Sequence, residues 1–414
     1  MANDGCQLPA WTGQAFAYLP HHPRGTALAS QSYAQLKPQG MQTSAGLSTS
    51  GPAAALREDR TGVWNGPAPV GSTGRTQNGA ETAATAVPQS EYLLLRSGAN
   101  LPLVGFGTYK VDKADSVRCA IAEGYRHIDC ASFYGNEETI GEGIAEFISQ
   151  GHRSDLFITS KIWNDAHRPK LVRASCEKSI KDLGCEYLDL LLMHWPEAWE
   201  PDSGMPGKPD HTVTIQQTCS ESTYPDSGMA GKPDDTVTIH QTWEAMEELV
   251  DSGLVRHLGV SNFSVKQVEE LLECARIKPV ANQVELHPFL PQRKLVGVCA
   301  RKGVHCIAFS PLGHSDPGVI NDDVMKEVAQ ELGRTSAQVC LKWNVQRGVP
   351  VIPRSQNPKN IKANIDGIFD WVLPRAAKAK LDTLDSGIRK VQAEWHDWGD
   401  VEEGGASKPS KVLA

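Results

Sequence analysis

The amino-acid sequence predicts an α/β fold, a closed (β/α)8 or TIM barrel, for residues 91–414. From residue 91 onward, short apolar runs of strand-forming residues alternate with longer amphipathic runs of helical period. Strands that are apolar throughout, each followed by a helix, are typical of a parallel sheet covered by helices. Eight such units within about 280 residues fit a closed barrel better than an open, doubly wound sheet.

The order of the elements follows from this alternation. The first two strand-like segments, 92–96 and 101–104, are joined by Ser97-Gly98-Ala99-Asn100, which predicts an N-terminal β-hairpin. The buried barrel strands are expected at 103–107, 127–130, 157–161, 188–194, 255–260, 280–284, 305–310 and 350–353. Helices are expected between them, for example at 137–149, 170–183, 242–251, 265–275 and 336–346.

The first barrel strand argues against a Rossmann domain. Gly105-Phe106-Gly107 is followed by Thr108-Tyr109-Lys110, so the third glycine of the dinucleotide-binding fingerprint is missing. No helix pattern opens at this point either. The sequence therefore favours the barrel over a nucleotide-binding open sheet.

The first 90 residues differ in composition from the rest. Of these residues, 59 are Ala, Gly, Ser, Thr, Pro or Gln and nine are charged, with no helical or strand period. Such a segment buries too little apolar surface to offset the entropy cost of ordering. We therefore expect a disordered, low-complexity leader over 1–90 and one barrel domain over 91–414. The leader lacks a secretory signal, so we expect a cytoplasmic protein, with a plastid or other organellar transit peptide as the alternative.

A tandem duplication follows the fourth barrel strand. The segment 201–218 returns at 225–242 with 15 of 18 residues identical. The second copy leads into a helix, where Thr238 is expected as the N-cap and Gln241 completes a capping box. The first copy leads into no such helix.

We expect the duplicated segment, 197–244, to form an extended loop at the mouth of the barrel. Its Pro, Gly, Asp and Ser content indicates a disordered loop or a lid, and a short hairpin between the TVTI stretches 212–215 and 236–239 is left open. Added loop length costs little closure entropy. Deletion of 197–220 is therefore expected to leave the thermal midpoint unchanged.

Composition excludes several classes of protein. The formal net charge of −8 argues against nucleic-acid binding, which depends on a basic surface. No apolar run approaches the ~20 residues of a membrane helix. The ten cysteines are too sparse for a disulfide scaffold and form no Cys-x-x-Cys pair. We therefore expect no nucleic acid, no membrane and no metal among the partners.

Four polar side chains stand at or just after the ends of predicted strands: Asp129, Tyr134, Lys161 and His194. The carboxyl ends of barrel strands face the active site, so we expect these side chains to converge. A buried lysine cation lowers the cost of ionising a neighbouring phenol, and a carboxylate keeps the lysine charged. A phenol in this setting can act as a general acid.

Eight segments make the chain resemble the aldo-keto reductase superfamily, whose members are (β/α)8 NADPH-dependent carbonyl reductases. They are LPLVGFGTY (101–109), GYRHIDCASFYGNE (124–137), TSKIW (159–163), LDLLLMHWPE (188–197), GVSNFS (259–264), NQVELHPFL (282–290), FSPLG (309–313) and VIPRSQNPKNIKAN (351–364). They occur in family order and at family spacing apart from the duplication. Within the superfamily, the sequence most resembles the plant and algal aldose-reductase-like members.

The resemblance implies an NAD(P)H-dependent oxidoreductase, an aldehyde or aldose reductase that converts a carbonyl to the alcohol. Tyr134 would protonate the carbonyl oxygen, Lys161 paired with Asp129 would depress the pKa of Tyr134, and His194 would orient the substrate. The implied cofactor-binding residues are Gly107, Thr108, Asp129, Ser261, Asn262, Gln283, Phe309, Ser310, Leu312, Arg354, Ser355 and Asn364. The implied substrate-binding residues are His194, Tyr109, Phe133, Trp163 and Trp195.

Several positions depart from the family pattern. Phe309 stands where a Tyr usually stacks on the nicotinamide, and Arg354 replaces the Lys that usually pairs with the 2′-phosphate. Asn360 and Ala363 replace an Arg and a Glu of the adenosine site. Arg354 keeps the positive charge, and Lys359 and Lys362 lie close enough to compensate in part for the lost Arg, so NADPH stays the expected cofactor with a weakened preference over NADH. The tail tryptophans, 395 and 398, lie where family members carry a specificity loop, but the tail departs from the family pattern and its role is left open.

Two alternatives to an active reductase stay open. One is a non-catalytic NADPH-binding regulatory barrel, and the other is an enzyme impaired by the loop duplication. Because a pure binding module has no need of Tyr134 beside Lys161, the sequence favours catalysis. We expect a monomer that acts on a small-molecule carbonyl substrate, which the sequence does not specify further.

Overall fold

The computed structural model describes residues 90–201, 203, 231–313, 318–391, 393, 395, 396 and 398. The predicted leader, most of the first repeat copy and residues 399–414 lie outside the described residues, so the predictions for them stay predictions. Across the described part of the chain, no helix is long and apolar enough to cross a lipid bilayer.

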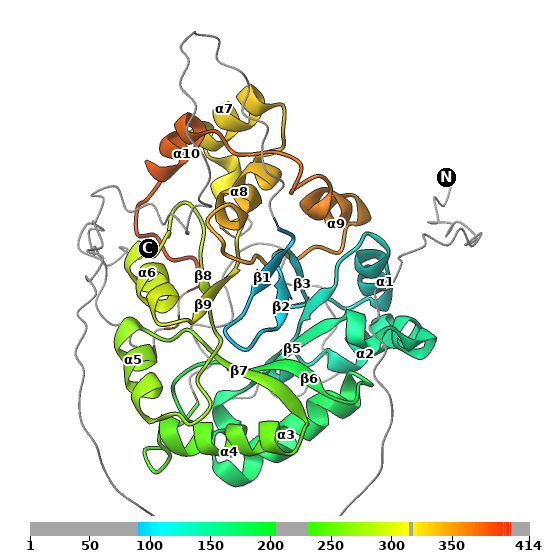
Figure 1. Ribbon diagram of the computed structural model, residues 1–414, viewed down its shortest axis with the longest axis vertical. Coiled ribbons are helices and arrows are strands. Elements are labelled where there is room, and N and C mark those ends of the chain that lie inside the picture. Colours follow the sequence, from blue (N-terminus) through cyan, green and yellow to red (C-terminus); the bar gives the residue numbers. More distant parts are fainter. Residues whose placement is uncertain are drawn as a thin grey trace, which may run out of the picture. The chain divides into compact units, whose positions relative to one another are not determined.

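Parallel strands form the central sheet in chain order, from β3 to β9, and helices surround it (Figure 1). This arrangement confirms the predicted fold class. The strands are β1 (Tyr92–Leu94), β2 (Asn100–Pro102), β3 (Gly105–Gly107), β4 (His127–Asp129), β5 (Phe157–Ile162), β6 (Leu188–Met193), β7 (Val255–Ser261), β8 (Ala281–Glu285) and β9 (His305–Phe309). The helices are α1 (Ala114–Ala122), α2 (Glu137–Phe147), α3 (Pro169–Asp182), α4 (Ile239–Asp251), α5 (Val265–Cys274), α6 (Arg293–Arg301), α7 (Asp323–Leu332), α8 (Ser336–Val345), α9 (Pro358–Ile365) and α10 (Arg375–Asp382).

The sheet closes into a barrel at the position predicted for the eighth strand. Val351 forms isolated parallel bridges to Val104, just before β3, and to Ala308 in β9. Pro350 and Pro353 flank this position. Since proline has no N–H to donate to a ladder, the predicted strand is reduced to a one-residue bridge that still joins the two edges.

The predicted hairpin closes one end of the barrel. β1 pairs antiparallel with β2, and the turn between them passes through Gly98 at a φ of 85°. Leu95 and Leu101 are buried in the same apolar cluster as Phe157 and Val280, which lie at the amino ends of β5 and β8. The hairpin therefore covers the amino end and leaves the carboxyl end of the strands for a site.

Helix α4 begins where the second repeat copy ends. Thr238 Oγ1 accepts from the Gln241 N–H, and Gln241 Oε1 accepts from the Thr238 N–H at 2.9 Å, which confirms the predicted capping box. The helix buries Trp243 and Met246 against the barrel. Because Ile239 already belongs to the helix, the stretch 236–239 forms no strand, and the hairpin left open for it is wrong.

Candidate active site

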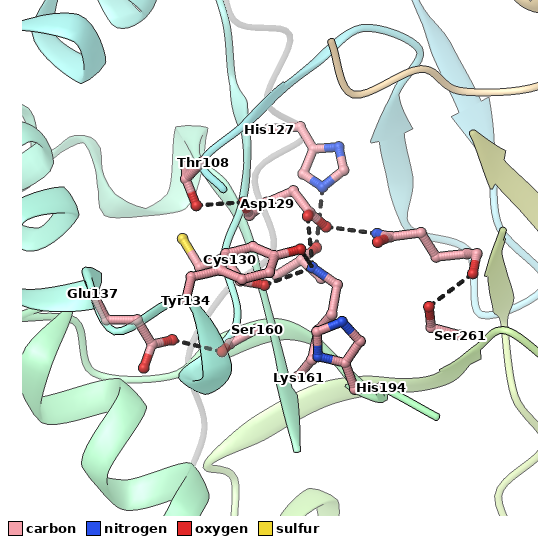
Figure 2. Close-up of polar contacts among 12 residues, drawn as sticks. Thr108, His127, Asp129, Cys130, Tyr134, Glu137, Ser160, Lys161, His194 and Ser261 are labelled. Carbon is pink, nitrogen blue, oxygen red and sulfur yellow. Dashed lines mark hydrogen bonds and ion pairs between the residues drawn. The ribbon is translucent and has the colours of Figure 1, made fainter. Parts of the chain in front are cut away.

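The carboxyl ends of neighbouring strands bring the predicted catalytic residues to one rim. Asp129 is the last residue of β4, Lys161 lies near the end of β5, and His194 directly follows β6. Parallel pairing of these strands keeps their ends level. Figure 2 shows Asp129, Lys161 and Tyr134 converging, with His194 beside them.

A buried ion pair forms the centre of the site. Lys161 Nζ donates to Asp129 Oδ1 at 2.6 Å, to Cys130 O at 2.7 Å and to Tyr134 Oη at 3.2 Å. Gln283 Nε2 donates to the other carboxylate oxygen of Asp129 at 2.6 Å. We call Asp129, Tyr134, Lys161 and Gln283 the polar centre. Since Lys161 and Asp129 are each 1% exposed, both charges depend on this pairing.

The pKa of Lys161 reflects its partners. Burial alone would lower that pKa, but the Asp129 carboxylate and the Tyr134 hydroxyl raise it above its usual range. The ammonium group therefore stays charged beneath the phenol at any physiological pH.

A short 3-10 turn, η1 (Ser132–Tyr134), carries the phenol. Ser132 Oγ donates to Lys161 O at 2.9 Å, which fixes the start of the turn to β5. Asn136 Nδ2 donates to Thr108 O at 2.8 Å and to Val111 O at 2.7 Å, which fixes the residues after the turn to the β3–α1 loop. Tyr134 is therefore held from both sides by side chains that bond to the main chain.

The Lys161 cation lowers the pKa of Tyr134, as the sequence predicted, but burial acts in the opposite direction and is the larger effect. The net pKa is therefore raised to about 12, because desolvation of the phenolate outweighs the attraction of the ammonium group. The phenol keeps its proton at neutral pH, and Lys161 makes loss of that proton easier than burial alone would allow.

His194 is neutral at pH 7. Its pKa lies well below the usual value because burial, the Lys161 cation and His167 disfavour the imidazolium. The ring lies edge-on to the ring of Tyr134, with centroids 5.9 Å apart. Among the described residues Nδ1 of His194 has no hydrogen-bond partner. A neutral imidazole carries one N–H, which suits a donor to a carbonyl oxygen.

A cavity of about 680 Å³ opens at this rim. The predicted residues that line it are Gly107, Thr108, Tyr109, Asp129, Phe133, Tyr134, Trp163, His194, Trp195, Ser261, Asn262, Gln283, Phe309, Ser310, Leu312 and Arg354. Lys161 lies beneath Tyr134 rather than in the lining. Ser355 and Asn364 are absent from the lining; Ser355 Oγ accepts from Asn357 N at 3.1 Å, and Asn364 is buried in α9. Their predicted cofactor contacts stay predictions.

One side of the cavity fits a nicotinamide. Asn262 adopts a φ of 61°, a left-handed conformation that Asn tolerates better than most residues. Its Oδ1 is buried with no partner among the described residues, and so can accept from a carboxamide N–H. Phe309 offers a ring face in the same lining. At Gly107 a Cβ would lie 2.7 Å from Ile352 O, so only glycine fits this close approach.

The cationic side chains of the cavity lie at its rim. Arg354 Nε donates to Tyr109 O at 3.0 Å, and Arg354 Nη2 donates to Lys110 O at 2.6 Å. Lys110 also lines the cavity, although sequence analysis gave it no role. Two cations on one rim fit an anionic group such as a phosphate.

Five aromatic residues of the cavity lining form what we call the aromatic wall: Phe133, Trp163, Trp195, Trp199 and Trp395. Phe133 stacks on Trp163 with ring centroids 3.7 Å apart. Trp199 was not predicted as a site residue, and the role of Trp395 was left open. A third tryptophan close to a strand end, only four residues after Trp195, was the available signal for Trp199.

The burial of Trp199 changes one sequence-based expectation. Trp199 is 3% exposed and packs against Trp163 and Trp395. Deletion of 197–220 would replace it with Thr223, because the repeat returns after 24 residues. The structure therefore favours the opposite outcome, a lower thermal midpoint for this deletion.

Fold and site together define a class of protein: a parallel β/α barrel enzyme with an acid–base centre at the carboxyl ends of its strands. Comparison with known proteins specifies the class further. The profile described as "Aldo/keto reductase family" matches residues 104–316. Aldo-keto reductase family 1 member A1 of Bos taurus is 39% identical over 314 residues, which cover 72% of this chain and 90% of the relative. Aldose reductase B of Dictyostelium discoideum is 40% identical over 308 residues, covering 73% and 94%.

A solved structure agrees with these relatives. The aldose reductase of Schistosoma japonicum is 33% identical, with a TM-score of 0.66, and the match covers 76% of this chain and all of that chain. The chain belongs to the aldo/keto reductase family. It is therefore an oxidoreductase that acts on carbonyl groups, as the sequence predicted. The expected likeness to plant and algal members stays a prediction.

Proposed function

We propose that the chain reduces a small aldehyde or ketone to the alcohol with NADPH, and that Tyr134 is the proton donor. The buried polar centre carries this proposal, because a catalytically silent barrel would gain nothing from a phenol 3.2 Å from a buried ammonium group. The nicotinamide, when bound, supplies the hydride. The chain's own residues supply the proton, the orientation of the carbonyl and the exclusion of water.

Tyr134 holds the proton at Oη until the carbonyl oxygen gains negative charge. Its pKa of about 12 keeps the phenol protonated across the physiological range. Once the proton leaves, the phenolate lies next to Lys161, whose ammonium group is fixed by Asp129 and Cys130 O. Lys161 therefore stabilises the product state of the proton transfer rather than abstracting the proton itself.

His194 orients the carbonyl. Because its imidazole is neutral, it can donate one hydrogen bond without placing a second cation beside Lys161. Asn262 Nδ2 donates to the His194 carbonyl at 3.0 Å, which ties the histidine to the loop that holds the nicotinamide side of the cavity. Substrate and cofactor contacts thus share one main-chain framework.

The cofactor would be held along the opposite side of the cavity. Asn262 Oδ1 and Gln283 would contact the carboxamide, and Phe309 would stack on the nicotinamide ring. Arg354 would pair with the 2′-phosphate through its planar fork, which favours NADPH over NADH. The predicted monomeric state and cytoplasmic location stay predictions.

The test is turnover by the purified full-length chain. NADPH consumption and alcohol formation are measured together with a panel of aldehydes and ketones. We expect one alcohol formed for each NADPH consumed. Tight NADPH binding with no consumption on any carbonyl would instead support the regulatory alternative, and weak binding of every nicotinamide cofactor would support impairment by the duplication.

A further inference from the structure

The C-terminal tail, residues 389–391, 393, 395, 396 and 398, is fastened to the rim at two places. The first is Glu285, the last residue of β8, which is fully buried. Its carboxylate accepts from Lys390 N at 2.7 Å and from Val391 N at 2.9 Å. These bonds place Val391 and Ala393 in the cavity lining.

The second fastening joins the tail to the loop after β6. His396 Nδ1 donates to Glu197 Oε1 at 2.6 Å, and the His396 side chain is 1% exposed. The imidazole lies edge-on to the indoles of Trp195, with centroids 5.1 Å apart, and of Trp398, at 4.4 Å. Glu197 itself belongs neither to the polar centre nor to the residues that line the cavity.

Through this second fastening the tail completes the aromatic wall. Trp395, next to His396, packs edge-on against Trp195 at 4.8 Å and against Trp199 at 4.9 Å. Two of these indoles come from the β6–α4 loop and one from the tail, almost 200 residues later. No covalent or sheet contact joins the two segments within the described residues, so side-chain contacts set their spacing.

Trp199 is in turn held by the stem of the duplicated loop, which we define as residues 197–201, 203 and 231–234. Trp199 pairs with Pro233 in an antiparallel bridge, and Glu200 N donates to Lys232 O at 2.7 Å. At Gly231 a Cβ would lie 2.4 Å from the Trp199 ring, so the second strand of the stem packs directly on the indole. The stem thus pairs the residues that lead into the first repeat copy with residues 231–234 of the second copy.

We propose that Glu197 is a positioning residue that joins the stem to the tail and so fits the active site to flat, aromatic carbonyl compounds. The proposal rests on the reductase function proposed above. The rings of the aromatic wall would stack on an aromatic substrate or contact it edge-on, which favours its binding. Each hydroxyl of a sugar would instead lose hydrogen bonds to water on entering this side of the cavity. Without Glu197, the tail would keep its Glu285 fastening but lose the one that places Trp395.

The test compares three variants of the full-length chain. Glu197→Ala removes the fastening, and Glu197→Gln keeps an acceptor for the His396 N–H. Glu200→Ala is the matched control, because Glu200 lies in the same stem but pairs with the exposed Lys232 at 2.6 Å. KM and kcat are measured for 2-naphthaldehyde and for propanal, together with the rate of tryptic cleavage after Arg389 and Lys390.

We expect Glu197→Ala to raise KM for 2-naphthaldehyde by about tenfold, as expected for the loss of one or two aromatic contacts, with kcat and the propanal constants unchanged. Tail cleavage should accelerate several-fold. Glu197→Gln and Glu200→Ala should resemble the original chain in both readouts. Equal changes for both aldehydes, or tail cleavage as slow as in Glu200→Ala, would overturn the proposal.

The two proposals fail separately. If the original chain reduces no carbonyl, the reductase function fails, but tail cleavage and quenching of tryptophan fluorescence by 2-naphthaldehyde still compare the variants. A weaker quenching constant and faster cleavage in Glu197→Ala alone would support the positioning role of Glu197. Identical constants in all variants would contradict it.

Discussion

The polar centre and the aromatic wall face the same cavity but are held in place by different means. Asp129, Lys161 and Gln283 come from strands and bond to one another. The wall comes mostly from a loop and the tail, and the indole N–H groups of Trp163 and Trp395 are buried with no partner among the described residues. The strand ends fix the distances on which proton transfer depends. The loop and the tail that form the wall can differ in sequence from one substrate specificity to another without changing those distances.

The largest expected effect comes from breaking the polar centre. Lys161→Met leaves the Asp129 carboxylate buried without its cation, which should lower the free energy of unfolding by about 3–5 kcal/mol. Asp129→Asn combined with Lys161→Met removes both charges and should recover much of that loss. Thermal and urea unfolding of the single and double variants measure this. A single variant as stable as the original chain would mean that the ion pair is not a buried, interdependent unit.

The wall is tested by two deletions of equal length. Deletion of 201–224 restores one repeat copy and keeps Trp199, so the thermal midpoint should hold. Deletion of 197–220 has the same length but puts Thr223 in place of the buried Trp199, and loss of a buried tryptophan costs about 3–5 kcal/mol. Differential scanning calorimetry should give a clearly lower midpoint for the second deletion only. Equal midpoints would show that the wall does not depend on Trp199.

Arg354→Ala addresses the cationic rim between these two regions. Loss of a charge-assisted pair with the 2′-phosphate should weaken NADPH binding by about 1.5–3 kcal/mol. NADH has no such phosphate, so its binding should weaken only because the variant loses the Arg354 bonds to Tyr109 O and Lys110 O. Titration with both cofactors gives the ratio of the NADH and NADPH dissociation constants, with Arg354→Lys as the control. An unchanged ratio in Arg354→Ala would show that Arg354 only stabilises the loop and does not bind the 2′-phosphate.

The smallest effect is expected from pH. The reaction needs Tyr134 protonated, and with a pKa of about 12 this form is lost only as the pH rises toward that value. It also needs a neutral His194, and the lowered pKa means that this form is lost only well below pH 6.5. Turnover of a saturating aldehyde should therefore stay nearly constant from about pH 7 to pH 9. A titration centred in that interval would show that one of the two pKa directions is reversed.

Local patterns explain why the polar centre could be predicted and the tail could not. Asp129, Lys161 and His194 each end an apolar run, so the parallel fold alone brings them to one rim. The contact between Glu197 and His396 spans 199 residues and depends on how a loop and a tail fold back, which no local period records. The effect of Lys161 on the pKa of Tyr134 was predicted in the right direction, but the net shift was not, because it depends mainly on how deeply the phenol is buried.

The eighth strand and the capping box show the same difference between features that a local sequence pattern determines and features that depend on the whole fold. Thr238 and Gln241 form the predicted capping box because both partners lie within four residues of each other. The strand at 350–353 was predicted from its apolar composition, but prolines on either side of Val351 and Ile352 limit its pairing to single bridges. Only the closed sheet shows that main-chain hydrogen bonds of residues 350–353 still join both edges.

The most direct test of the proposed chemistry is single-turnover reduction by Tyr134→Phe. The variant keeps the ring and its packing but lacks the only hydroxyl that bonds to the Lys161 ammonium group among the described residues. We predict that NADPH binds with unchanged affinity while the rate of carbonyl reduction falls by at least ~10²–10⁴-fold. A near-normal rate with intact cofactor binding would contradict the assignment of Tyr134 as the proton donor, and with it the central role of the polar centre.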